Sequence, residues 1–61
     1  MVNLTSKELA VIEDQLSNEQ VAIKKYRLYA QTCTDPQLKT KCDEFASTHQ
    51  RHYDTLLTYL G

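Results

Sequence analysis

The sequence predicts an all-α fold, a two-helix antiparallel hairpin with two long helices joined by one short turn. Apolar residues recur every three or four positions along both halves of the chain, and this is the spacing of one face of an α-helix. The only proline is Pro36 and the only glycine is Gly61, so no breaker interrupts either half. We therefore expect a single domain over residues 1–61, with helices at about 5–33 and 36–60 and a turn at 34–35.

The first helix is predicted to begin at a capping box. Thr5 and Glu8 have the required spacing, and each side chain would satisfy a backbone amide that has no partner inside the helix. Leu4 before the cap and Leu9 after it fit the hydrophobic staple that accompanies such a box. The apolar face then continues through Leu9, Ile12, Leu16, Ile23, Tyr26, Ala30 and Cys33. Glu19 stands in this series where the pattern expects an apolar residue.

The second helix is predicted to begin at Asp35 and Pro36. Aspartate is a favourable N-cap, and proline at the first helical position loses no hydrogen bond. The apolar face of this helix runs through Leu38, Cys42, Phe45, His49, His52, Leu56 and then Tyr59 or Leu60. Residues three apart on a helix point the same way, so the two histidines of the chain can converge on one object.

The polar interruptions of the two faces are predicted to share one layer. A turn this short makes the helices antiparallel, so residues equally far from the turn lie side by side. Glu19 lies fifteen to sixteen residues before the turn, and His49 and His52 lie on average sixteen residues after it. At a rise of about 1.5 Å per residue, all three should lie roughly 23 Å from the turn.

Two helices cannot cover faces of this width, so we expect a homodimer. A chain of 61 residues buries only about 60% of the surface that its unfolded form exposes, and it usually needs a partner. Two hairpins would form an antiparallel four-helix bundle. A two-fold axis would then double the polar layer to two copies of Glu19 and four histidines.

Glu19, His49 and His52 are candidate metal ligands, because imidazole and carboxylate groups bind first-row transition metals such as zinc or iron. In the alternative interpretation, the histidines are core or interface residues that hydrogen-bond to each other or to Glu19. A buried carboxylate needs a cation or a hydrogen-bond donor beside it. Both interpretations supply such a partner, so both remain open at this point.

The remaining composition argues against several functions. Seven basic and eight acidic residues give a net charge of −1, so we expect no nucleic-acid partner. No apolar run approaches the roughly 20 residues of a membrane span, and the N-terminal residues lack the apolar core of a signal peptide. Cys33 and Cys42 lie at unequal distances from the turn, so we expect free thiols and a reducing, cytoplasmic setting. No catalytic triad or phosphate-binding glycine loop is present, and we expect no enzymatic activity.

The chain resembles the helical hairpin of ferritin-like, rubrerythrin-type proteins over roughly residues 8 to 60. The matching pattern is Glu19-x-x-Ala22-x-x-x-Tyr26-x-x-Tyr29-Ala30, followed by Phe45-Ala46-x-x-His49-x-x-His52-x-x-x-Leu56-Leu57. The resemblance implies a ferritin-like four-helix bundle made from two copies. It also implies that Glu19 matches the metal-binding glutamate of the first helix and that His52 matches the histidine of the Glu-x-x-His motif on the second. His49 departs from the family, because it stands where that motif has its glutamate.

The departure at His49 changes what the resemblance implies about function. A dimer would offer two carboxylates where the family's site offers four, and this set suits zinc, copper or nickel better than a di-iron centre. Among ferritin-like proteins, the chain looks most like small spore coat proteins of the Coat F type. That likeness implies a structural role in a spore coat, with other coat or assembly proteins as partners. A metal-binding protein is the alternative, and a small helical adaptor that docks on another protein is a third option.

Overall fold

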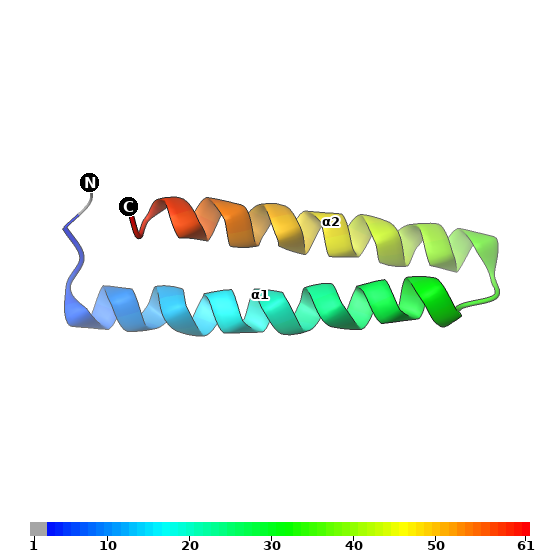
Figure 1. Ribbon diagram of the computed structural model, residues 1–61, viewed down its shortest axis with the longest axis horizontal. Coiled ribbons are helices and arrows are strands. Elements are labelled where there is room, and N and C mark those ends of the chain that lie inside the picture. The colour runs from blue at the N-terminus through cyan, green and yellow to red at the C-terminus, as the bar shows by residue number, and fades with distance from the viewer. Residues whose placement is uncertain (1–2) are drawn as a thin grey trace.

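The computed structural model describes residues 3–61, and in this range it contains two α-helices and no strand. Helix α1 spans Ser6–Thr32 and helix α2 spans Pro36–Thr58. The helices lie antiparallel, with the turn at one end and the start of α1 beside the end of α2 at the other (Figure 1). The predicted all-α hairpin is therefore confirmed, with helix bounds within two residues of the predicted ones.

Both predicted helix starts have the expected caps. The backbone amide of Glu8 donates to Thr5 Oγ1 at 3.1 Å, and the amide of Thr5 donates to Glu8 Oε1 at 2.9 Å. Asp35 Oδ1 accepts hydrogen bonds from the amides of Gln37 and Leu38, and Pro36 occupies the first helical position. These side chains satisfy amides that the helix itself leaves without a partner, so both boundaries follow from local sequence.

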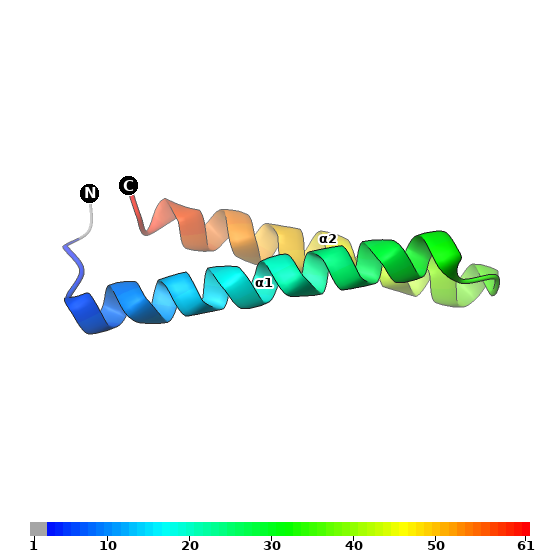
Figure 2. The same cartoon turned by 60° about the horizontal axis from the view of Figure 1, so that its bottom comes forward.

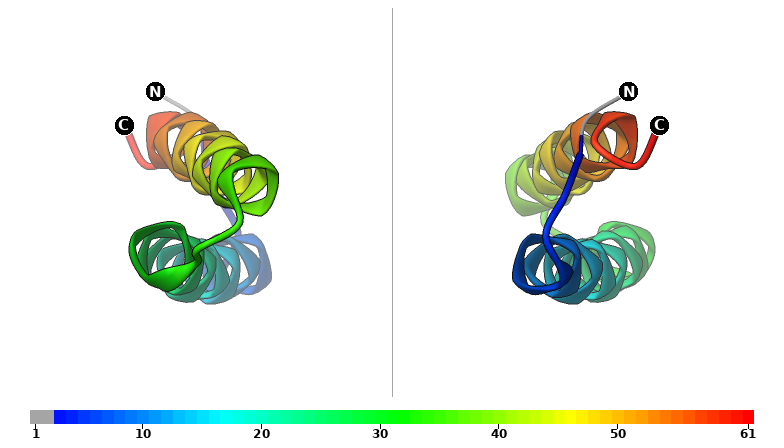
Figure 3. Two further views of the ribbon diagram at one scale, coloured as in Figure 1. Left: turned by 90° about the vertical axis from the view of Figure 1, so that its right-hand side faces the viewer. Right: turned by 90° about the vertical axis from the view of Figure 1, so that its left-hand side faces the viewer.

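Small side chains separate the helices in the half of the hairpin nearer the turn. Ala30, Cys42 and Ala46 are buried there, and only 1% of Ala46 remains exposed. The helix axes are inclined to one another and do not run strictly parallel (Figures 2 and 3). Cys33 and Cys42 are both free thiols, in agreement with the predicted absence of a disulfide.

Much of the apolar surface of the hairpin is uncovered. The exposed large apolar side chains are Leu9, Val11, Val21, Leu28, Tyr29, Leu38, Phe45, Leu57, Tyr59 and Leu60. Several of them belong to the faces that the sequence predicts to be core. Across residues 3–61, neither helix is long and apolar enough to cross a membrane.

Candidate metal centre

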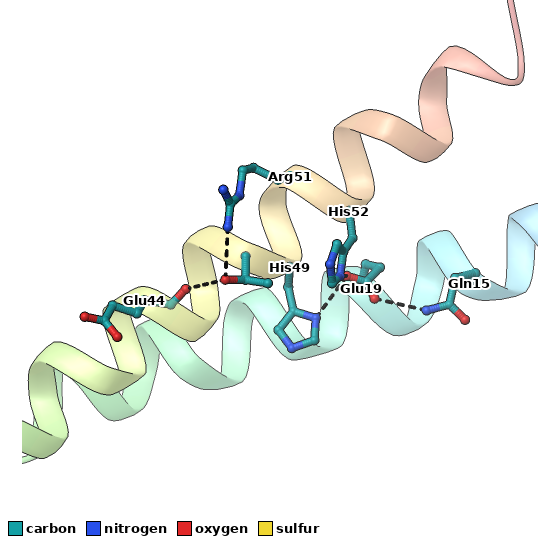
Figure 4. Close-up of polar contacts among 7 residues, drawn as sticks. Gln15, Glu19, Glu44, His49, Arg51 and His52 are labelled. Carbon is teal, nitrogen blue, oxygen red and sulfur yellow. Dashed lines mark hydrogen bonds and ion pairs between the residues drawn. The ribbon is translucent and has the colours of Figure 1, made fainter.

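Glu19 of α1 and the two histidines of α2 meet halfway along the hairpin, as the count of residues from the turn predicts. Glu19 Oε2 lies 2.9 Å from His49 Nδ1 and 3.2 Å from His52 Nδ1. Figure 4 shows both imidazoles reaching from α2 toward this one carboxylate. We call Glu19, His49 and His52 the polar layer.

The carboxylate of Glu19 is buried and has a partner for each of its oxygens. Only 6% of its side chain is exposed. Gln15 Nε2 donates to Oε1 at 3.0 Å, and the histidines lie beside Oε2. Among residues 3–61, no buried side-chain nitrogen or oxygen lacks a hydrogen-bond partner. The polar layer therefore avoids the penalty of a buried polar group left without a partner.

The surroundings of Glu19 favour its ionised form. Burial by itself raises the pKa of this carboxyl group, but the hydrogen bonds from His49 and Gln15 and the charges of His49 and His52 outweigh it. The pKa of Glu19 consequently lies below its ordinary value of 4.5. An ionised carboxylate only accepts hydrogen bonds, so in the tautomer with hydrogen on Nδ1, His49 donates to Glu19 Oε2 at 2.9 Å.

The two histidines differ in how firmly they are held. The ring of Tyr26 stacks on His49 with centroids 5.7 Å apart and planes 7° apart, so His49 is fixed by a stack and a hydrogen bond. The side chain of His49 is 29% exposed, whereas that of His52 is 56% exposed. His52 lines an open hollow with Gln15, Glu19, Thr55, Leu56 and Tyr59. The polar layer is thus closed on the His49 side and open to solvent at His52.

The three donors fit a single metal ion better than a di-iron centre. One ligand atom from each residue lies within 4.8 Å of the others. A tetrahedral zinc ion bound at about 2.0–2.1 Å would space its donors by about 3.3 Å, which is close to the separations of 2.9 and 3.2 Å at Glu19. Two imidazoles and one carboxylate leave a fourth position open, as in zinc sites of the His₂Glu type. One carboxylate per chain is too few for a carboxylate-bridged iron pair.

Two supporting residues, Gln15 and Tyr26, were not predicted to serve the polar layer. Gln15 lies four residues before Glu19, and an amide at that spacing on a helix can reach the carboxylate, so a sequence signal for it exists. The stacking of Tyr26 on His49 has no comparable signal, because Tyr26 reads as an ordinary member of the apolar face. Cys33 and Cys42 take no part in the polar layer.

Comparisons with models of protein families, with curated proteins and with solved structures found no match for this chain. The resemblance to ferritin-like proteins therefore stays a prediction.

Proposed function

We propose that this chain is a building block for protein assembly and that two hairpins pair into a ferritin-like four-helix bundle. The main support for this pairing is the solvent-accessible surface of a single hairpin, which is 4795 Å². A compact monomer of 7.1 kDa exposes about 4,100 Å². The hairpin therefore has a large excess of surface, and much of it is apolar.

Pairing would remove an area typical of an obligate dimer. Two separate hairpins expose twice 4795 Å², which is about 9,600 Å², whereas a compact protein of twice the mass exposes about 6,800 Å². The difference of about 2,800 Å² falls within the range of about 2,000–5,000 Å² for obligate homodimers. Packing against a second copy thus accounts for the uncovered side chains.

A melting experiment at several protein concentrations tests this pairing. If folding requires two copies, the Tm followed by circular dichroism should rise with protein concentration, because association stabilises the folded state by mass action. Phe45→Glu places a charge on exposed apolar surface and should lower the Tm at every concentration. A Tm that is independent of concentration would contradict the proposal.

The role that fits such a building block is structural, in a spore coat together with other coat or assembly proteins. This part of the proposal is supported by the resemblance of the sequence to small coat proteins of the Coat F type. Immunogold labelling of spores from the source organism should place the protein in the coat. Labelling confined to the cytoplasm of vegetative cells would contradict a coat role.

Metal binding is the second candidate function, and it is favoured by the convergence of the three donors of the polar layer. A ligand that binds the folded state stabilises it by about 2.7 kcal/mol when its concentration is 100 times its Kd. Added zinc should therefore raise the Tm of the wild type and leave that of His49→Ala unchanged. Elemental analysis of purified protein provides an independent measurement. Absence of metal together with an unchanged Tm would exclude this function.

A further inference from the structure

We infer that the second copy packs on one particular face of the hairpin in an end-for-end arrangement, in which α1 of one chain runs antiparallel to α1 of the other. The two polar layers then meet at the centre of the dimer. This inference rests on the proposed self-association. It adds which face is used and in which direction the two chains run.

One face of the hairpin carries three open hollows in a row, and we call it the grooved face. The hollow near the turn includes Tyr29 and Phe45, the middle one includes Glu19 and His52, and the third includes Val11 and Tyr59. The residues that α2 contributes recur at intervals of seven: Leu38, Phe45, His52 and Tyr59. All four are exposed. A seven-residue repeat of exposed, mostly apolar side chains is the seam by which helices associate.

The opposite face is less suited to receive a partner helix. Its hollow is lined by Gln20, Ile23, Lys24, Gln50 and Tyr53. Gln20 Nε2 donates to the Tyr53 hydroxyl at 3.2 Å and links the two helices across this face. On the grooved face, by contrast, the hollow nearest the turn is lined mainly by aromatic, aliphatic and cysteine side chains.

Because Glu19 lies at the middle of α1, two α1 helices in the end-for-end arrangement overlap along their whole length. Helix α1 spans Ser6–Thr32, so thirteen residues precede Glu19 and thirteen follow it. A two-fold axis through this level brings each polar layer beside the other and apolar surface beside apolar surface. His52, which is open to solvent in one chain, would be covered, and the partner's imidazoles would lie next to the three donors of each chain.

Charge selects the end-for-end direction. Before Glu19, the charged residues of α1 are Lys7, Glu8, Glu13 and Asp14; after it, they are Lys24, Lys25 and Arg27. End-for-end packing of the two grooved faces places α1 beside the partner's α1, with the acidic half of one helix beside the basic half of the other. Packing in the same direction places α1 beside the partner's α2 and loses this match. Complementary charge fixes the orientation of partners and disfavours the wrong one.

One complementary pair lies at the edge of the grooved face. Asp14 and Lys25 are eleven residues apart in α1, which is about three turns, so they lie on the same side of the helix. Asp14 precedes Glu19 by five residues and Lys25 follows it by six. Across the two-fold axis, Asp14 of each chain therefore falls at the level of Lys25 in the other chain, and the dimer contains two such pairs.

Charge reversal tests the predicted pair. Lys25→Glu should raise the dimer Kd about fivefold, since each of the two pairs is worth about 0.5 kcal/mol. Lys24→Glu makes the same change of charge on the opposite face and should leave the Kd within about twofold of wild type. Adding Asp14→Lys to Lys25→Glu should restore the wild-type Kd. Equal effects of the two lysine changes, or no rescue, would overturn the inference.

A distance measurement tests the direction independently. A spin label at Thr34→Cys, in a Cys33→Ser, Cys42→Ala background, marks the turn of each chain. End-for-end packing predicts labels about 45 Å apart, since each turn lies about fifteen residues from the centre. A distance within about 20 Å would mean that the helices pack in the same direction at their usual separation, and it would overturn the inference while leaving the dimer intact. If the spin labels show no coupling and the protein has the mass of a monomer, the proposed self-association is contradicted instead.

Discussion

Near the turn, the two helices meet through small side chains, whereas halfway along the hairpin they meet through a carboxylate and two imidazoles. Ala30, Cys42 and Ala46 are almost completely buried, and all three have small side chains. In the polar layer, Glu19 is equally buried, but His52 remains largely open to solvent. The region near the turn is closed by close packing of small side chains. The polar layer is held by hydrogen bonds, and it is open to solvent on the His52 side.

This difference separates what holds the fold from what is available for function. Close packing of small residues sets the helix separation and tolerates little added volume. A hydrogen-bonded polar cluster adds less net stability, because its members exchange bonds with water for bonds with each other. The polar layer is consequently the region where a ligand or a partner can add stability.

Ala46→Leu should have the largest effect on stability. Ala46 is 1% exposed, so extra volume there would push the helices apart and lower the free energy of unfolding by about 2–3 kcal/mol. Ala10→Leu, at an exposed position of α1, is the matched control and should change it by less than about 0.5 kcal/mol. Urea unfolding followed by circular dichroism measures both. Similar losses in the two variants would mean that the turn half is not closely packed.

Removing the carboxylate should have a smaller effect, and its size should depend on the replacement. Glu19→Ala leaves a cavity and deprives His49 and Gln15 of their acceptor, which should cost about 1–2 kcal/mol. Glu19→Leu restores the apolar pattern and fills the cavity, and the partly exposed His49 and His52 can bond to water in place of the carboxylate. It should therefore keep about the wild-type stability. A large loss of stability in Glu19→Leu would show that the polar layer holds the fold.

Acidification should weaken the polar layer selectively. The pKa of Glu19 in the folded protein lies below 4.5, so its contribution to stability is fully present above that pH and is lost as the pH falls through the folded pKa. As the pH falls below 4.5, metal-free wild type should therefore lose more stability than Glu19→Gln. Glu8, whose pKa is also lowered by its capping bonds to Thr5, contributes to both proteins and cancels in the comparison. Equal losses would contradict the expected role of the ionised Glu19.

The smallest effect is expected from the stack that supports His49. Tyr26→Leu removes the aromatic ring and should lower the free energy of unfolding by about 0.5–1 kcal/mol, whereas Tyr26→Phe keeps the ring and should be nearly neutral. Chemical shifts of the His49 ring protons should move in the leucine variant, because the ring current of Tyr26 is lost. Unchanged shifts would mean that the stack does not form in solution.

These regions also differ in how far the sequence predicts them. The capping box at Thr5, the Asp35 cap and the shared level of Glu19 with the histidines follow from local spacing and from counting residues across a short turn. The exposure of His52 and the stacking of Tyr26 depend on the inclination of the helices and on side-chain rotamers, which spacing does not specify. Leu38 and Phe45 fit the predicted core pattern, yet they are exposed in one chain. Their burial would require the second copy that the sequence pattern predicts.

Sedimentation equilibrium over a series of protein concentrations tests most directly the claim that this hairpin works as a pair. We expect a folded, helical species with twice the mass of the 7.1 kDa chain, and helicity that falls as dilution dissociates the dimer. A fully helical protein that keeps the mass of one chain at every concentration would contradict the proposed pairing.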